Sequence, residues 1–293
     1  MPFHALFANN GGLATTQQLE ALISHKMLRS QVRAGNLVRV WHGVYSPQPP
    51  DLHGRLAALD LLAGQPIVAC MNTAAELYGF NTETDESIHI LDPGVRMRPN
   101  KLLVVHQRVG APLKRVASRL ATTPAWTAVE MARTLRRPRA LAVLDAALHS
   151  GLCTQEELTS VIREHKGRRG IVNVRELVAY ADERSESAME SETRLVFIDG
   201  GLPLPDLQYE IVDKFAKRWR VDFAWPEAKL AAEYDSAEWH ANTDAFKHDR
   251  MKVARLQECG WTSIPVVVDD VRRHPIDLVA RIFTHLDRPQ LAS

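Results

Sequence analysis

The sequence predicts a mixed α/β protein, of α+β type, with three parts: a small helical N-terminal domain, a mixed α/β middle region and a C-terminal domain around an antiparallel hairpin. Three observations support this class. Capped helices precede an apolar hairpin in the first fifty residues, helical and strand-like segments alternate through the middle, and a period-2 run forms a second hairpin near residue 225. The predicted domain boundaries are 1–50, 51–183 and 184–293.

Length, charge and cysteine content restrict the class of protein further. The chain has 293 residues, 45% of them hydrophobic, which is enough for two or more small domains with their own cores. The formal net charge is +1, so any affinity for nucleic acid must come from local clusters of charge. Three scattered cysteines, no signal peptide and no long apolar run predict a soluble, cytoplasmic protein with no membrane partner.

The first fifty residues have the pattern of a winged helix-turn-helix. Thr15 and Gln18 form a capping box that opens one helix, and a basic helix follows over about residues 26–34. Gly35 ends the basic helix, and an apolar hairpin follows over residues 37–45. In a winged helix the basic helix, third in order, enters a DNA major groove while the hairpin touches the backbone.

One face of the basic helix is apolar, with Leu28 and Val32, and the other face is polar and basic. The residues predicted to contact DNA from this face are Lys26, Arg29, Ser30 and Arg33. A solvated basic face on an ordinary helical domain would explain the same charges. The order of capped helix, basic helix, glycine and hairpin is more specific and favours DNA binding.

This N-terminal segment resembles the winged-helix domain of AbiEi-type antitoxins from type IV toxin–antitoxin systems. The run MLRSQVRAGNLVRVWHGVYSP, with its glycine stop, apolar hairpin and Gly43-Val44-Tyr45, carries most of the similarity. The layout of residues 51–183 also resembles the region after the winged helix in those proteins. The resemblance implies a DNA-binding regulator whose partners are DNA and a cognate toxin protein.

The C-terminal domain is organised around the hairpin over residues 218–235. Its first strand alternates apolar and polar residues, and its second strand ends in Glu-Tyr-Asp after a tight turn. The turn predicts a register in which Trp225 faces Leu230 and Asp222 faces Glu233. Directly opposed carboxylates destabilise a strand pair. The pair therefore predicts a divalent cation held by oxygen ligands.

Helices and strands on either side of this hairpin complete the predicted domain. A helix over 188–199 and a strand over 207–212 precede it. A helix over 244–259 then leads to a strand over 264–268, which a right-handed crossover lays parallel to the second hairpin strand. The predicted order is helix, three antiparallel strands, crossover helix, strand and final helix.

This order and three motifs resemble the PD-(D/E)xK nuclease superfamily, and within it a very-short-patch-repair-type endonuclease domain. The motifs are ESETRL, RVDFAWPEAKLAAEYDS and KHDRMKVARLQECGW, and the similarity covers about residues 187–282. The resemblance implies a restriction-endonuclease-like core that cleaves DNA with Mg²⁺ or Mn²⁺ as cofactor. It also implies that Asp222, Glu233 and Glu190 hold the metal and act in catalysis.

Asp235 stands where that superfamily usually has a lysine, and an aspartate cannot supply positive charge to a phosphate. We keep Asp235 among the candidate catalytic residues, together with His240 as a possible proton donor or acceptor. Three basic residues of the following helix are candidates to replace the missing cation or to contact DNA; they are Lys247, Arg250 and Lys252. A salt bridge between Arg220 and Asp235 is the purely structural alternative.

Two functions stay open at this point. One is a metal-dependent DNA endonuclease targeted by its winged helix. The other is a non-catalytic DNA-binding regulator of antitoxin type, whose C-terminal domain serves only for interaction.

Overall fold

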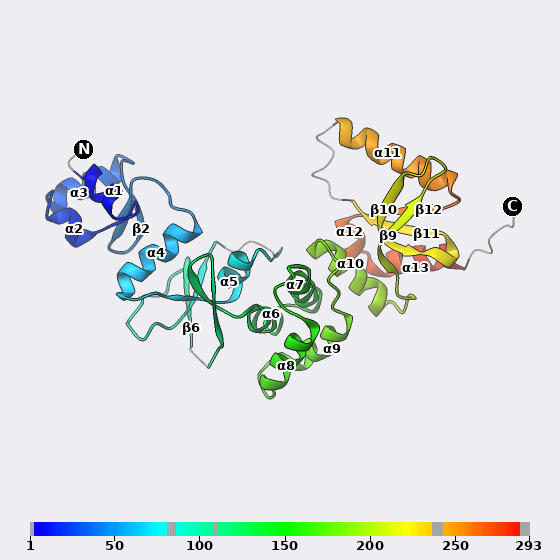
Figure 1. The fold of residues 1–293 in the computed structure, drawn as a ribbon, viewed down its shortest axis with the longest axis horizontal. Coiled ribbons are helices and arrows are strands. Elements are labelled where there is room, and N and C mark those ends of the chain that lie inside the picture. Colours follow the sequence, from blue (N-terminus) through cyan, green and yellow to red (C-terminus); the bar gives the residue numbers. More distant parts are fainter. Residues whose placement is uncertain (1–2, 81, 83–85, 108–109, 236–242, 288–293) are drawn as a thin grey trace. The chain divides into compact units, whose positions relative to one another are not determined.

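The computed structural model divides into two compact units (Figure 1). The residues it describes are 3–80, 82, 86–107, 110–235 and 243–287. One unit comprises Met1–Leu77 and Asp85–Thr123, and the other comprises Tyr78–Thr84 and Pro124–Ser293. Helices and strands are mixed throughout, as the sequence predicts. The division after residue 123 falls inside the predicted middle region, because the strands of that region belong to the first unit and its later helices to the second.

The first unit begins with three short helices and a three-stranded sheet of order β1-β3-β2. The elements are α1 (His4–Asn9), β1 (Ala14–Thr15), α2 (Thr16–Glu20), α3 (His25–Arg33), β2 (Val38–Trp41) and β3 (Val44–Ser46). The predicted capping box is present, since the side chains of Thr15 and Gln18 each accept a hydrogen bond from the other's backbone N–H. Leu19 and Leu28 lie in the core of this segment.

A five-stranded sheet of order β6-β5-β4-β8-β7 follows. Its elements and neighbouring helices are α4 (Leu52–Ala63), β4 (Val68–Ala69), α5 (Met71–Tyr78), β5 (Ile88–Leu91), β6 (Leu103–His106), β7 (Leu113–Val116) and β8 (Arg119–Thr122). The predicted strands β5 and β6 are present and pair in parallel. The hairpin of β7 and β8 is missing from the sequence prediction because Leu113, Lys114 and Arg115 are all exposed, so β7 shows no alternation.

Four helices open the second unit: α6 (Pro124–Ala132), α7 (Arg137–His149), α8 (Gln155–Glu164) and α9 (Ile171–Leu177). The short turn η1 (Val178–Tyr180) leads towards α10 (Ala188–Asp199), which packs against α7. Helices α6 and α7 are buried along most of their length, as expected for helices that are apolar on every side. The capping box predicted at the start of α8 is present, with Thr154 and Glu157 as its partners.

The second unit ends in a four-stranded sheet of order β12-β11-β10-β9. Its elements are β9 (Asp206–Val212), β10 (Arg218–Trp225), η2 (Pro226–Ala228), β11 (Leu230–Tyr234), α11 (Thr243–Glu258), β12 (Thr262–Val266), α12 (Val268–Arg272) and α13 (Pro275–Leu286). Trp225 pairs with Leu230, and β12 runs parallel to β11, both as predicted. The short helix α12 is absent from the sequence prediction.

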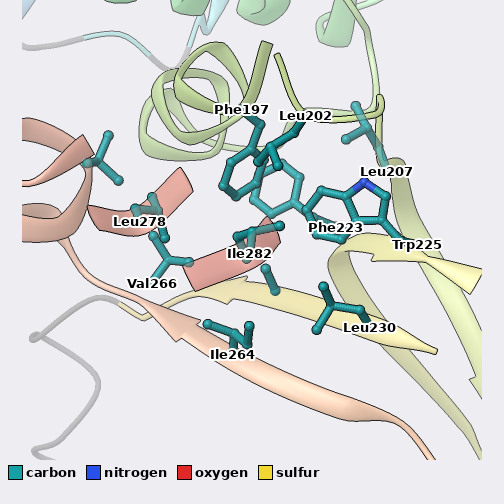
Figure 2. Packing of buried hydrophobic residues seen from close by; sticks show 12 residues of the cluster. Phe197, Leu202, Leu207, Phe223, Trp225, Leu230, Ile264, Val266, Leu278 and Ile282 are labelled. Carbon is teal, nitrogen blue, oxygen red and sulfur yellow. The ribbon is translucent and has the colours of Figure 1, made fainter. Parts of the chain in front are cut away.

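Two hydrophobic clusters cover the two faces of this sheet. Phe197 of α10 packs edge to face against Phe223 and Trp225 of β10, with Leu278 of α13 in the same cluster (Figure 2). On the other face, Leu256 of α11 packs with apolar residues of β9, β10 and β11. Helices α10 and α13 therefore lie on one face of the sheet and α11 on the other (Figure 1).

The strict alternation predicted for β10 is interrupted at Asp222. Val221 and Phe223 would share a face in a regular strand, but they belong to different clusters. Gln208 lies opposite Asp222 in the β9–β10 register and has a φ of +52°, a left-handed conformation. This irregularity changes the face of the strand at the position of the candidate site. None of the helices in the described residues is both long and apolar enough to span a bilayer.

Candidate functional site

Asp222 and Glu233 lie on the neighbouring strands β10 and β11. Extending the β10–β11 register by one residue beyond the pair of Phe223 and Ala232 places the two carboxylates opposite each other. Both side chains are half-buried. The backbone N–H of Tyr234 donates a hydrogen bond of 2.9 Å to Oδ2 of Asp222, which fixes the orientation of that carboxylate.

Glu233 has partners on two other elements. The ammonium group of Lys252 on α11 forms an ion pair with Oε2 of Glu233. The hydroxyl of Ser263 on β12 donates a hydrogen bond of 3.3 Å to Oε1. Of the three basic candidates on α11, Lys252 thus lies against the carboxylates, and it brings positive charge to a site where Asp235 cannot.

Glu190 is held by α10 and β9. One of its carboxylate oxygens accepts hydrogen bonds from the backbone N–H of Glu186 at 2.9 Å and from the side-chain amide of Gln208 at 3.0 Å. Its own N–H donates to the hydroxyl of Ser187, the N-cap of α10, at 3.1 Å. Within the described ranges, no three His, Cys, Asp or Glu side chains gather into a metal-binding group. Glu190 as a third metal ligand stays a prediction, and the nearby negative charge of Asp222 acts on its carboxyl group.

Burial raises the pKa of all three carboxyl groups. For Glu190 the negative charge of Asp222 adds to this effect. The hydrogen bond from the N–H of Tyr234 opposes the rise in the pKa of Asp222, and the positive charge of Lys252 opposes the rise in the pKa of Glu233. Ionised carboxylates in such a setting are stabilised by a further cation, so the electrostatics of the site favour cation binding.

Arg220 forms a bidentate ion pair with Glu186, with both nitrogen–oxygen distances at 2.7 Å. The partner of Arg220 is thus Glu186, and the salt bridge of Arg220 with Asp235 stays a prediction. The segment before α10 passes beside β10 and offers Glu186, whereas Asp235 lies beyond the end of β11. There the backbone N–H of Asp235 donates to the carbonyl of Val266 on β12 at 2.8 Å.

The remaining candidates of the C-terminal domain are Lys247, Arg250, Asp235 and His240. Lys247 and Arg250 lie on the exposed surface of α11, and Asp235 is half-buried. His240 lies outside the described residues. The structure thus brings together Asp222, Glu233 and Lys252 of the predicted set.

The basic face predicted in the N-terminal segment is present on α3. Leu28 is 1% exposed and anchors the helix, while the predicted DNA-contacting residues face solvent; they are Lys26, Arg29, Ser30 and Arg33. Ser24 caps α3 by accepting a hydrogen bond of 3.3 Å from the N–H of Met27. Arg39 of β2 contacts His42 in the hairpin turn and adds a cation there.

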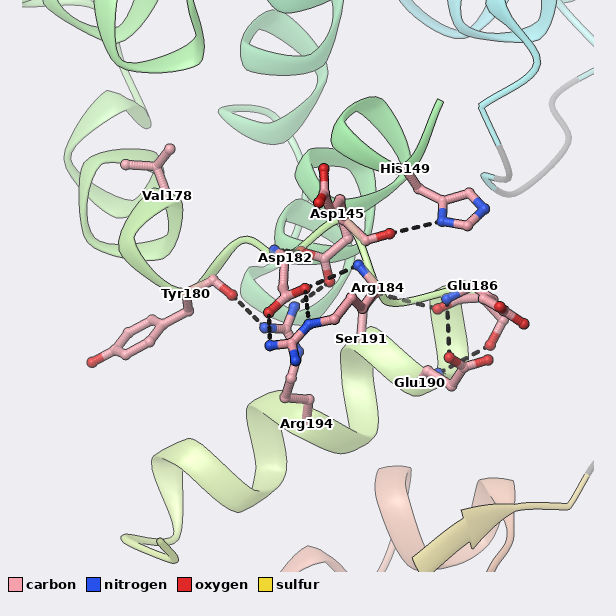
Figure 3. Close-up of polar contacts among 12 residues, drawn as sticks. Asp145, His149, Val178, Tyr180, Asp182, Arg184, Glu186, Glu190, Ser191 and Arg194 are labelled. Atoms are coloured by element: carbon pink, nitrogen blue, oxygen red, sulfur yellow. Dashed lines mark hydrogen bonds and ion pairs between the residues drawn. The ribbon is translucent and has the colours of Figure 1, made fainter. Parts of the chain in front are cut away.

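Sequence reasoning missed the buried charges that anchor α10. Arg194 forms an ion pair of 2.5 Å with Asp145 of α7, and its second guanidinium nitrogen donates to the carbonyl of Tyr180 at 2.5 Å (Figure 3). Glu192, 4% exposed, accepts ion pairs from two arginines, Arg139 at 2.9 Å and Arg272 at 3.1 Å. The signal in the sequence is the charged pair Glu192 and Arg194 inside ESETRL, directly before the apolar run Leu195-Val196-Phe197-Ile198.

Comparison with known proteins identifies the middle of the chain. The model of the AbiEi antitoxin C-terminal domain matches residues 67–180, which confirms the resemblance predicted for that region. Two relatives from Mycobacterium tuberculosis are the uncharacterized protein Rv2248 of strain H37Rv and the uncharacterized protein MT2308 of strain CDC 1551. Each is 61% identical over 270 residues, covering 92% of this chain and 100% of the relative. The chain belongs to the same family as these mycobacterial proteins, and its residues 67–180 are similar to the AbiEi antitoxin C-terminal domain.

Proposed function

We propose that the chain binds DNA and hydrolyses phosphodiester bonds at a divalent-cation site formed by Asp222 and Glu233. The observation that carries the proposal is the pair of half-buried carboxylates on adjacent strands, with Lys252 against one of them. The sheet order β12-β11-β10-β9, with α10 and α11 on opposite faces, supports a PD-(D/E)xK-type core.

The donor set suits Mg²⁺ or Mn²⁺. Mg²⁺ in phosphoryl-transfer sites is held by one or two carboxylates and completes its shell with waters and substrate phosphates. Asp222 and Glu233 supply two such carboxylates, and their raised pKa values reflect a cost of ionisation that a cation would relieve. A bound cation would supply electrostatic stabilisation of the charge that develops on the phosphoryl oxygens.

The neighbouring residues of the chain have separate roles in this proposal. The N–H of Tyr234 orients Asp222, and the hydroxyl of Ser263 orients Glu233. Lys252 provides the positive charge towards the phosphate that a lysine at position 235 would otherwise provide. Lys247 and Arg250 contact the DNA backbone, Asp235 and His240 are candidates for proton transfer, and Glu190 holds α10 to β9 beside the site.

In the same proposal, α1–α3 and β1–β3 form a winged helix-turn-helix. The order of the elements and the exposed basic face of α3 support it. Lys26, Arg29, Ser30 and Arg33 would contact DNA from α3, and Arg39 would contact the backbone from the hairpin.

The match to an AbiEi antitoxin C-terminal domain favours a second function. In this case the chain is a DNA-binding regulator that acts against a cognate toxin protein, and its C-terminal sheet serves for interaction without catalysis. The aspartate at position 235 agrees with this alternative.

Nicking of supercoiled plasmid by the purified full chain with Mg²⁺ or Mn²⁺ separates the two functions. Asp222→Asn keeps an acceptor for the N–H of Tyr234 but removes the charge, so it should abolish nicking. Glu227→Gln is the matched control, because Glu227 is an exposed carboxylate in the turn of the same hairpin. Wild-type nicking by Asp222→Asn would contradict hydrolysis at this site, and DNA binding without nicking would favour the regulator.

A further inference from the structure

The turn between β9 and β10 holds a phenylalanine ring out into solvent. Phe215 is 63% exposed. Hydrogen bonds hold the conformation of this turn: the Asp213 carboxylate accepts one from the N–H of Phe215 at 2.8 Å and one from the N–H of Lys217 at 3.0 Å. The same carboxylate accepts a third bond from the indole N–H of Trp219 at 2.9 Å. The exposed ring is therefore presented by a defined turn.

Cations lie against the aromatic rings of this turn. The ammonium of Lys214 is 5.2 Å from the centre of the Phe215 ring, and the guanidinium of Arg255 on α11 is 4.5 Å from it. Glu258 fixes both cations, with ion pairs of 3.0 Å to Lys214 and 2.8 Å to Arg255. Lys217 lies 3.7 Å from the ring of Trp219 in the same way.

The charge of this surface remains positive after its own ion pairs are counted. Its cations are Lys214, Lys217, Arg218 and Arg255, and its exposed carboxylates are Glu210 and Glu258. Asp213 is buried beneath the turn, where its oxygens bind the turn's own N–H groups and the indole. A ligand that covers Phe215 therefore meets mainly positive charge around the ring.

We infer that Phe215 is a stacking platform for an unpaired base of single-stranded DNA, with the surrounding cations on the flanking phosphates. An aromatic ring set among cations is the arrangement by which single strands are bound without regard to sequence. Bases in a duplex are already stacked and offer no free face to the ring, so this surface distinguishes unpaired from paired DNA. An apolar protein partner would bury the same cations without compensation, which is costly.

The platform and the carboxylates lie along the same two elements. Phe215 and Asp222 are seven residues apart on one strand and its turn, so the backbone between them spans at most about 23 Å at about 3.3 Å per residue. On α11, Arg255 lies beside Phe215 and Lys252 lies against Glu233. An unpaired strand bound along α11 therefore reaches from the platform to the candidate site. The inference deepens the proposed function by naming the form of its substrate, and it rests on that proposal in taking DNA as the ligand.

Fluorescence anisotropy of the full chain with a labelled single-stranded oligonucleotide and with the matching duplex, both in EDTA, tests this inference. Loss of a stacked base costs about 1–3 kcal/mol, so Phe215→Ala should weaken single-strand binding by about 5- to 150-fold. Duplex binding through α3 should be unchanged, and Phe215→Trp should keep the single-strand affinity. Quenching of 2-aminopurine in the bound strand should also disappear in Phe215→Ala.

Ile276→Ala is the control, because Ile276 on α13 is 81% exposed and has no part in the turn. Single-strand affinity equal to wild type in Phe215→Ala would overturn the inference, as would an equal loss in Ile276→Ala. EDTA removes divalent cations, so this outcome does not depend on cleavage. A chain that binds single strands through Phe215 but never nicks plasmid would refute the proposed hydrolysis and leave this inference standing.

Discussion

Replacement of Arg194 by methionine should strongly destabilise the second unit, because it leaves a buried carboxylate without its cation. Asp145 is 1% exposed, and it accepts hydrogen bonds from Arg194 at 2.5 Å and from the N–H of Asp182 at 2.9 Å. Methionine replaces much of the aliphatic part of arginine but supplies no charge. Asp145 and the carbonyl of Tyr180 would both lose their bond to the guanidinium.

The expected loss in free energy of unfolding is about 3–5 kcal/mol, the usual cost of removing one partner from a buried ion pair. The loss should depend on pH. Burial raises the pKa of the Asp145 carboxyl, and Arg194 opposes that shift, so the variant should raise this pKa further. Because this pKa is raised in the folded state, ionised Asp145 destabilises the fold. This loss of stability is complete above the folded-state pKa and disappears below the unfolded value of about 3.9, where the carboxyl is protonated in both states.

Urea unfolding followed by far-ultraviolet circular dichroism at pH 8 and at pH 4 measures this difference. The double variant Asp145→Leu with Arg194→Met removes both charges and should recover much of the stability, because no ion is left unpaired. The reasoning would be refuted if the free energy of unfolding of Arg194→Met lay within about 1 kcal/mol of the wild-type value at pH 8. A larger loss of this free energy at pH 4 than at pH 8 would refute it as well.

Two further predictions concern the N-terminal helix and a second buried cluster. Arg29→Ala with Arg33→Ala should reduce the slope of log K against log salt in gel shifts by about 1.8, since each phosphate contact contributes about 0.9; an unchanged slope would remove α3 from the DNA interface. Burial raises the pKa of Glu130, but hydrogen bonds from His165 and Arg133 outweigh it and lower that pKa to about 2. Wild-type stability should therefore be full above the ordinary value of 4.5 and fall as the pH drops through about 2, and Glu130→Gln should flatten this part of the thermal unfolding profile. If the thermal stability of wild type and of Glu130→Gln fell in parallel as the pH dropped through about 2, the role given to the Glu130 carboxylate would be contradicted.

The hairpin at the candidate site could be predicted from local sequence, because a tight turn fixes the register of both strands. The predicted pairing of Trp225 with Leu230 is confirmed, and the parallel β12 follows from the handedness of the crossover. The break at Asp222 could not be predicted, since it lies opposite a left-handed residue, Gln208, in the neighbouring strand. Pattern rules assume a regular partner strand.

The ion-pair partners of the charged residues could not be predicted from the sequence, because the partners come from distant segments of the chain. Glu186, the partner of Arg220, is 34 residues away, and Asp145 is 49 residues from Arg194. Three basic residues on α11 looked equivalent in sequence, and only the packing of the helix on the sheet places Lys252 against Glu233. A pattern of charges in the sequence can indicate candidate residues, but tertiary packing determines which of them form ion pairs.

Manganese binding to the full chain, followed through the electron paramagnetic resonance signal of free Mn²⁺, tests the proposed cation site most directly, since it requires no knowledge of the DNA substrate. We expect Mn²⁺ to bind, Mg²⁺ to compete, and Asp222→Asn and Glu233→Gln to lose binding. Glu227→Gln should bind Mn²⁺ as the wild type does. Equal Mn²⁺ binding by the wild type and Asp222→Asn would contradict a cation site at these carboxylates.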